Sequence, residues 1–151
     1  MNEENNVINS DWIYSMANRH KRETGLPVNI WLDEGKEYID GKHGKRIKFQ
    51  TNYGNSVQKN NLASMKLNGD VVEETYDKTV SEINKHDINE VSNFVKNNSY
   101  ALDKLADELI YSSDFDKVMI KGGEPASPEQ IAEQKRMVDE IISEENNVIE
   151  M

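Results

Sequence analysis

The spacing of apolar residues along the chain changes from two to about 3.6, and this change predicts an α+β protein. The segments 28–32 (VNIWL) and 46–50 (RIKFQ) carry apolar side chains at alternate positions, as half-buried strands do. Asn68-Gly69, between the runs SMKL and DVVE, predicts a two-residue type I′ hairpin. We expect a small antiparallel β-meander of three to four strands in this part of the chain.

A helix is predicted before the meander. Asn9 or Ser10 can cap it, and Gly25 and Pro27 end it. The basic cluster 19–22 then falls in the last turn, where cations complement the helix dipole.

After the meander, apolar residues recur at helical spacing from Ile88 to Leu109. Asp87 and Glu90 resemble a capping box at the start of this stripe. The polar residues 97–99 interrupt it, so either one long helix or two shorter ones would fit. We favour one long central helix, because the apolar spacing stays in register across the gap.

Two further elements are predicted near the C-terminus. Residues 114–121 (DFDKVMIK) indicate a short strand. Ser127 as N-cap, Pro128 at the first helical position and Gln130 at the third predict a C-terminal amphipathic helix. We assign the chain to a polar N-terminal tail (1–8), a single α+β domain (9–145) and a C-terminal tail (146–151).

Composition limits the classes of protein. The 151 residues suit one domain, and the absence of cysteine excludes disulfides and thiolate zinc sites. The acidic start MNEENN is unlike a signal peptide, and no apolar run approaches the length of a membrane-spanning helix, so we expect an intracellular protein that does not bind membranes. With 18 Lys+Arg against 28 Asp+Glu, the formal net charge of −10 disfavours nonspecific binding to nucleic acid but suits a basic protein groove.

One segment departs from this acidic composition. Residues 41–58 carry four cations and no acid: Lys42, Lys45, Arg46 and Lys48. Alternation places Arg46 and Lys48 on the face of their strand opposite Ile47 and Phe49. Together with His43, these cations predict an interaction surface for an acidic partner, unless the chain's own carboxylates neutralise them.

Aromatic residues near this segment raise a second possibility. Trp31, on the polar side of its strand, and Tyr53 are candidates for stacking on nucleic-acid bases beside the cations. The alternative for Trp31 is that it packs under a helix.

Candidate catalytic chemistry is sparse in the sequence. His20, His43 and His86 include no pair four residues apart, so we expect no metal site and no cofactor. Asp114 and Asp116 would share one face of the strand predicted there, as some metal-dependent nucleases require, and the alternative is a solvated acidic turn. We therefore expect no catalytic residues.

The order of these features resembles a family of small uncharacterised phage and prophage proteins. The resemblance rests on His43, the Arg46-Ile47-Lys48 strand, the hairpin, and the helix with Val95, Asn98 and Leu102, and it covers about residues 18–111. It implies a phage or mobile-element origin, and hence the cytoplasm of a bacterial host or a virion. It implies no catalytic residues. A related group has two histidines close together just before the strand, where this chain has only His43.

Three functions follow from these features. The first is a non-catalytic protein that binds a phage structural protein, a host defence enzyme or another copy of itself. The second is a nucleic-acid-binding protein that uses the basic strand 42–48. The third is a small metal-dependent nuclease or hydrolase that uses Asp114, Asp116 and a histidine. We favour the first.

Overall fold

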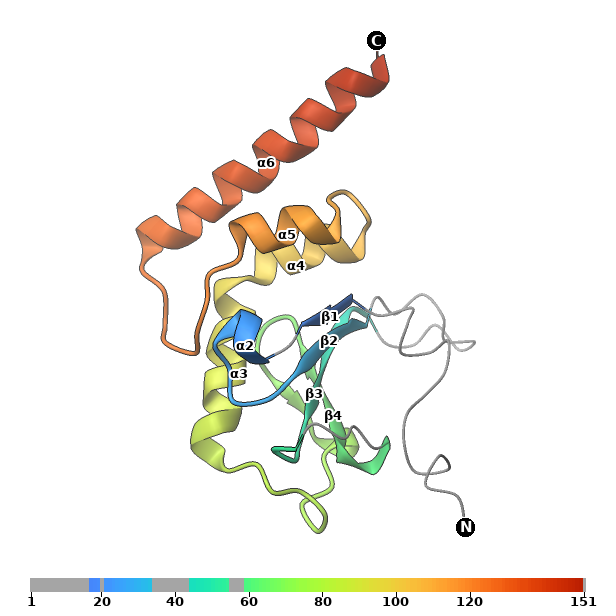
Figure 1. Cartoon of the computed structure of the whole chain (residues 1–151), viewed down its shortest axis with the longest axis vertical. Coiled ribbons are helices and arrows are strands. Elements are labelled where there is room, and N and C mark those ends of the chain that lie inside the picture. The colour runs from blue at the N-terminus through green and yellow to red at the C-terminus, as the bar shows by residue number, and fades with distance from the viewer. Residues whose placement is uncertain (1–16, 20, 34–43, 55–58, 151) are drawn as a thin grey trace.

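The structure is a computed structural model, and it describes residues 17–19, 21–33, 44–54 and 59–150. In these residues a β-meander is followed by a series of helices (Figure 1). The predicted α+β class and the antiparallel meander are confirmed. None of the helices described carries an apolar stretch long enough to cross a bilayer.

Each strand of the sheet pairs with its neighbour in sequence, in the order β1-β2-β3-β4-β5, and all pairs are antiparallel. The strands are β1 (Ala17–Arg19), β2 (Ile30–Asp33), β3 (Arg46–Gln50), β4 (Leu62–Lys66) and β5 (Val71–Val72). A short helix, α2 (Lys21–Thr24), joins β1 to β2, and 3₁₀ turns at Lys59–Asn61 and Glu73–Thr75 flank the last two strands.

One face of the sheet is apolar and belongs to the core. Ile47 on β3 lies opposite Leu32 and Met65, and Phe49 lies opposite Ile30 and Ala63. These six side chains are at most 3% exposed. Burial of a side chain of the size of leucine or phenylalanine stabilises a fold by about 1.5–3 kcal/mol, so this face anchors the sheet.

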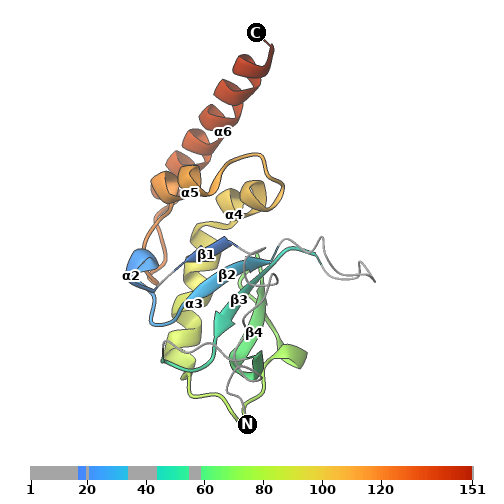
Figure 2. The ribbon, with the colours of Figure 1, turned by 45° about the vertical axis from the view of Figure 1, so that its right-hand side comes forward.

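Four helices follow the sheet: α3 (Lys85–Asn97), α4 (Ser99–Ala106), α5 (Ser112–Val118) and α6 (Pro128–Glu150). Their buried apolar side chains form one core cluster with the apolar face of the sheet. Helix α3 runs alongside the sheet, and the C-terminal part of α6 projects beyond α4 and α5 (Figures 1 and 2). Because α6 reaches Glu150, the segment predicted as a C-terminal tail begins inside this helix.

The prediction of an N-terminal helix can be compared with the structure at residues 17–19 and 21–25, and the two differ at residues 17–19. Ala17–Arg19 forms a strand paired with β2, and helical residues begin only at Lys21. The helix ends at Gly25 as predicted, with φ +78° and its N–H bonded to the Lys21 carbonyl at 2.9 Å. The predicted caps, Asn9 and Ser10, lie outside the described residues.

The hairpin between β4 and β5 lies where it was predicted, but its loop is one residue longer. Gly69 N donates to Lys66 O at 2.9 Å, and Lys66 N donates to Asp70 O at 2.8 Å. Only Gly69 in this loop has a positive φ, whereas a type I′ turn also requires one at Asn68. The connection is therefore a three-residue loop that ends in a left-handed glycine.

Two helical predictions need correction. The central stripe is carried by α3 and α4, which meet at Asn98, so two helices are found rather than one long helix. The cap of α3 is Asn84, whose Oδ1 accepts from Asp87 N at 2.8 Å, and not the Asp87–Glu90 pair.

Residues 112–118 form α5, so the strand predicted at 114–121 is wrong. Tyr111 N donates to Asp114 Oδ2 at 2.8 Å at the start of this helix. Phe115 and Val118, three residues apart, share the buried face at 1% and 4% exposure. Helical packing of these two side chains prevailed over the short alternating pattern.

The start of α6 is as predicted. Gln130 N donates to Ser127 Oγ at 3.2 Å, and Ser127 N donates to Gln130 Oε1 at 2.9 Å. This reciprocal pair is a capping box, and Pro128 is the first residue of the helix.

The link between α5 and α6 is tied to α3 by asparagine side chains. Asn93 donates to Gly123 O at 2.9 Å. Asn97 donates to Glu124 O at 2.7 Å and accepts from Ala126 N at 2.9 Å. Since residues 93 and 97 are one helical turn apart, they form a row that holds the backbone of this link against α3.

Gly123 permits this close approach. A Cβ atom at position 123 would lie 2.4 Å from Glu90 Cβ and 2.8 Å from Glu90 Cα. Contacts that short with backbone atoms force either the link or α3 to move.

We predict that Gly123→Ala lowers the free energy of unfolding by about 1–3 kcal/mol, because the added methyl group overpacks the contact with Glu90. Urea unfolding followed by circular dichroism measures the change. Gly44→Ala is the matched control, since a Cβ there meets nothing within 4 Å among the residues that the structure describes. Equal effects of the two substitutions would contradict this account.

Candidate functional site

The basic strand face predicted from the sequence is only partly described, since Lys42 and His43 lie outside the described residues. Of the other three cations, Arg46 and Lys48 lie on the face of β3 opposite the core, as predicted. Arg46 is half-buried and lies opposite Lys66 on β4.

Lys45 is neutralised within the chain. Its Nζ lies 2.6 Å from Asp103 Oδ1 on α4 and 2.7 Å from Oδ1 of Asp107, the C-cap of that helix. Burial alone would lower the pKa of Lys45, but the hydrogen bonds to both aspartates outweigh burial and raise it. This cation therefore connects the start of β3 to α4.

Lys48 is also engaged internally. Its side chain is 16% exposed, and its Nζ lies 3.8 Å from Asp33 Oδ2 and 3.2 Å from Ser64 Oγ. Burial lowers the pKa of Lys48 and nearby Arg46 lowers it further, whereas Asp33 partly offsets both. Two of the predicted interaction cations are thus paired with carboxylates of the same molecule.

The two predicted stacking residues have other surroundings. Trp31 lies opposite Lys48 in the sheet but is only 3% exposed, so its ring is covered rather than offered to a base. Tyr53 uses its hydroxyl to donate to Asp87 Oδ2 at 2.6 Å and to accept from Asn84 N at 3.1 Å. The hydrogen bond to Asp87 raises the pKa of Tyr53.

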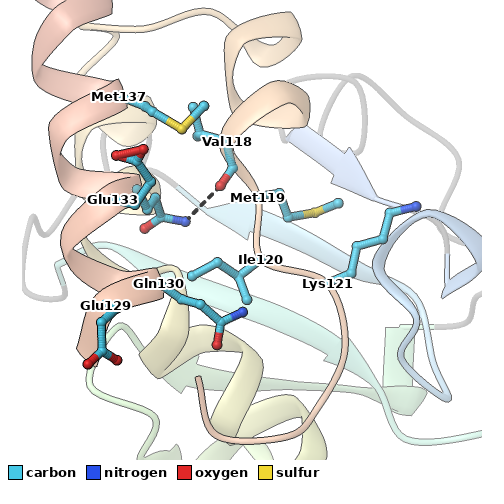
Figure 3. Close-up of a pocket in the computed structure, with 9 residues that line it drawn as sticks. Val118, Met119, Ile120, Lys121, Glu129, Gln130, Glu133 and Met137 are labelled. Atoms are coloured by element: carbon cyan, nitrogen blue, oxygen red, sulfur yellow. Dashed lines mark hydrogen bonds between the residues drawn. The ribbon is translucent and has the colours of Figure 1, made fainter. Parts of the chain in front are cut away.

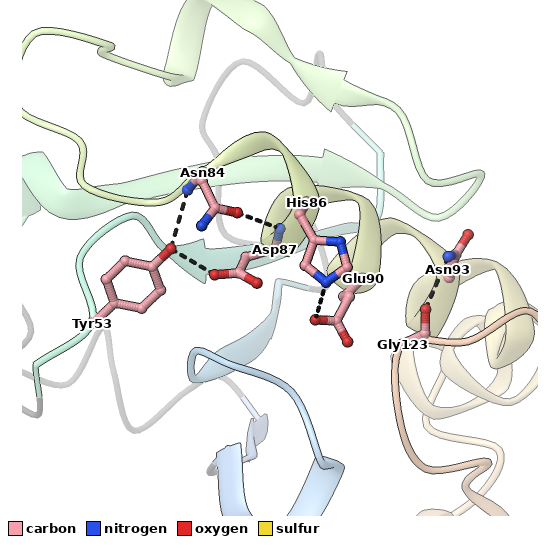
Figure 4. Close-up of polar contacts among 7 residues, drawn as sticks. All are labelled: Tyr53, Asn84, His86, Asp87, Glu90, Asn93 and Gly123. Carbon is pink, nitrogen blue, oxygen red and sulfur yellow. Dashed lines mark hydrogen bonds and ion pairs between the residues drawn. The ribbon is translucent and has the colours of Figure 1, made fainter.

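These tyrosine contacts belong to a polar cluster at the start of α3 (Figure 4). His86, Asp87 and Glu90 present ligand atoms that all lie within 4.8 Å of one another, which is the composition of a carboxylate–imidazole metal site. The His86 side chain is 79% exposed and lies 3.3 Å from Glu90. The cluster caps and braces the first turn of α3, and nothing else in it points to a ligand.

The carboxylates proposed for a nuclease do not meet on one face. Asp114 and Asp116 lie on α5, where residues two apart point to different sides. Asp114 is also occupied by its hydrogen bond to Tyr111 N. His20 and His43 lie outside the described residues, so only His86 can be placed.

Asn98 is the central polar residue of the helical layer. It is fully buried, and its Nδ2 donates to Phe94 O at 2.9 Å and to Ile120 O at 3.0 Å. Its Oδ1 accepts from Ile120 N at 2.8 Å and from Gln134 Nε2 at 2.7 Å. One carboxamide therefore joins the α3–α4 junction, the segment after α5, and α6.

Gln134, on α6, is the second buried amide of this network. It is 2% exposed, and its Nε2 donates both to Asn98 and to Val118 O, the latter at 3.2 Å. These two acceptors fix the orientation of the amide. Its Oε1 is buried and has no hydrogen-bond partner.

Two hollows flank the N-terminal half of α6. The first, of about 510 Å³, lies between α6 and residues 118–121 (Figure 3). Its apolar lining includes Met119 and Met137. Glu129 and Glu133 line it from α6, whereas the amine of Lys121 points away from that helix.

The second hollow, of about 450 Å³, runs along the other side of α6 and is called here the α6 groove. Its lining includes Leu67, Lys96, Tyr100, Ile131 and Lys135. Tyr100 donates a hydrogen bond to Asp139, and the amines of Lys104 and Lys135 lie 5.1 Å and 5.3 Å from its ring centre. Asp103 also lines the groove, but Lys45 and Lys104 pair with this carboxylate. The groove thus combines apolar residues with two lysines, Lys96 and Lys135, and one compensated aspartate.

Comparison of the chain with protein-family models, curated proteins and solved structures gives no match. The resemblance to phage proteins therefore stays a hypothesis.

Sequence reasoning missed both amides and the α6 groove. A signal was present for Gln134, because it stands three residues after Ile131 and four before Val138, inside the apolar stripe of α6. A polar residue in such a stripe is a candidate for a buried hydrogen bond. The groove had no local signal, because residues 67, 96–103 and 131–135 build it together.

We predict that Asn98→Leu lowers the free energy of unfolding by about 3 kcal/mol or more, because it leaves buried groups at Ile120 and Gln134 without partners. The comparison is Asn84→Ala, which removes an exposed helix cap and costs about 1 kcal/mol. Urea unfolding of both variants measures the difference. The account is wrong if Asn98→Leu is the milder substitution.

A second prediction concerns pH. Because the folded-state pKa of Lys48 is lowered, the folded protein releases this proton at a lower pH than the unfolded chain does. The unfolded chain then binds more protons, so stability rises with pH between the lowered value and the ordinary lysine pKa. Relative to Lys48→Met, the native protein should gain stability across this alkaline range in urea unfolding at a series of pH values. A constant or falling difference would exclude burial of a charged Lys48.

Proposed function

We infer that this chain is a non-catalytic protein that acts through protein–protein contact, and that α6 is its docking element. The resemblance to phage proteins suggests two roles for such a protein. It is either a component of a virion or another larger assembly, or an inhibitor of a host defence enzyme.

The charge distribution of α6 carries this proposal. No Lys or Arg follows Arg136, whereas five carboxylates do: Asp139, Glu140, Glu144, Glu145 and Glu150. A carboxylate in the last turn of a helix opposes the helix dipole by about 0.3–1 kcal/mol, and Glu150 stands in the last turn of α6. The helix nevertheless continues to Glu150, past the body of the protein (Figures 1 and 2).

Contacts within the chain account for only part of this charge. Arg136 lies 2.7 Å from Glu140 and 2.6 Å from Glu133, and Asp139 accepts from Tyr100. Among the ion pairs of the described residues, none involves Glu144 or Glu145. A helix end with this charge suits cations supplied by another molecule.

Apolar residues accompany these acids. Ile141 and Ile142 are half-buried against the core, and the same spacing continues in the sequence to Val148 and Ile149. A helical extension without packing partners has little stability in water. An amphipathic extension becomes more stable when its apolar face docks on another protein.

The internal pairing of Lys45 and Lys48 supports α6 over the basic strand as the docking element, because both lysines are committed to Asp33, Asp103 and Asp107. Nucleic-acid binding stays a prediction that rests on Lys42, His43 and Arg46.

The test is affinity purification of the tagged chain from cells in which it is naturally made, followed by binding measurements with the purified partner. We expect Glu144→Lys/Glu145→Lys to weaken partner binding by at least about tenfold, because reversed charges repel a basic surface. Glu73→Lys/Glu74→Lys is the matched control, since it changes the net charge equally at two adjacent exposed acids near the sheet. Equal losses in both variants, or no partner at all, would contradict a docking role for α6.

A further inference from the structure

The α6 groove, of about 450 Å³, is lined by both apolar and basic side chains. Ile131 is 40% exposed on one wall, and Leu67 and Tyr100 contribute to the other. Lys96 and Lys135 also line it, and neither takes part in an ion pair among the described residues. The groove therefore suits an apolar helix with acidic residues along its edges.

Ile131 and Lys135, which line the groove, belong to a line of positions along α6. It runs Ile131, Lys135, Val138, Ile142, Glu145 and Ile149, with alternating steps of four and three residues. This is the spacing of the contact positions of a coiled coil. Val138 is fully buried in the core, so the line is not the centre of a free face.

We propose that the occupant of the groove is α6 of a second copy of this chain, packed antiparallel to the first. The inference rests on the proposed function, because it names the partner of the same helix. In this arrangement the acidic C-terminal half of each α6 lies in the groove of the other copy, beside its lysines.

Charge selects the antiparallel orientation. In an antiparallel pair centred near residue 140, Lys135 of one copy lies opposite Glu145 of the other, and the symmetric contact repeats this pair. In a parallel pair, lysine would face lysine and glutamate would face glutamate at the same two positions. Parallel packing would also bring together two helix ends that carry five carboxylates each.

The pairing cannot be satisfied within one chain. Lys135 and Glu145 are ten residues apart, which is about 15 Å along a helix and beyond the screening distance of about 8 Å at physiological salt. Lys135 lies over Tyr100 on the groove wall, and its amine is thus placed where a second helix would meet it.

The test is a charge-swap cycle on the full chain, measured by sedimentation velocity and light scattering over a micromolar concentration series at physiological salt. We expect the wild-type chain to dimerise reversibly. Lys135→Glu and Glu145→Lys should each weaken the dimer by about tenfold or more, because each substitution replaces two attractive pairs with two repulsive ones. The double variant should restore the affinity, since it rebuilds both pairs with their signs exchanged.

Matched controls separate this effect from net charge and folding. Lys78→Glu and Glu74→Lys make the same charge changes at exposed positions away from α6 and should leave the dimer unchanged. Circular dichroism should show the same helical content and unfolding midpoint for each variant.

Two results would overturn the proposal: a wild-type chain that stays monomeric throughout the series, or a double variant that dimerises no better than the single ones. A third result is also possible: the wild-type chain is monomeric, but Glu144→Lys/Glu145→Lys weakens its binding to a different protein. In that case α6 keeps its docking role, and the groove is assigned to that other protein. Sedimentation and light scattering therefore test the dimer, whereas partner binding tests the proposed function.

Discussion

The helical half of this protein depends on the side chain of Asn98. Its carboxamide makes four hydrogen bonds in an interior where each unpaired polar group would cost about 1–3 kcal/mol. Those bonds join Asn98, at the junction of α3 and α4, to the backbone of Phe94 and Ile120 and to the side chain of Gln134 on α6. Asn98 thus helps to position the N-terminal half of α6, which borders both hollows.

Acidic residues divide into two groups with different roles. Asp33, Asp103 and Asp107 are used inside the domain, where they balance lysines at the sheet and connect it to α4. Glu144 and Glu145 on α6 have no such counterpart among the described ion pairs. A large negative charge is therefore compatible with a stable domain, because Asp33, Asp103 and Asp107 are paired with lysines, whereas acids such as Glu144 lie on the projecting part of α6.

Local patterns predicted the features that depend on near neighbours in sequence. The burial of Ile47 and Phe49 followed from alternation, and the start of α6 followed from Ser127 and Gln130. The hairpin was located correctly, but its loop length depended on the φ of Asn68, which composition does not fix.

Features with distant partners were not predicted from the sequence. The break at Asn98 is set by contacts with residues 22 and 36 positions away, so the apolar spacing, which stays in register across residues 97–99, was misleading. Helix α5 was missed because a short apolar run suits either a strand or a helix until its packing partners are known. In the candidate site, the polar face of β3 was predicted from the sequence. The internal pairing of its lysines and the α6 groove could be seen only in the three-dimensional structure.

The strand order of the sheet has a consequence for the timing of folding. Because every strand pairs with its neighbour in sequence, the sheet can form as it is synthesised, without waiting for distant segments. The α6 helix is made after all the elements on which it packs. A nascent chain would thus complete most of its core before its docking helix is available, so premature association between unfinished copies is disfavoured by the order of the elements alone.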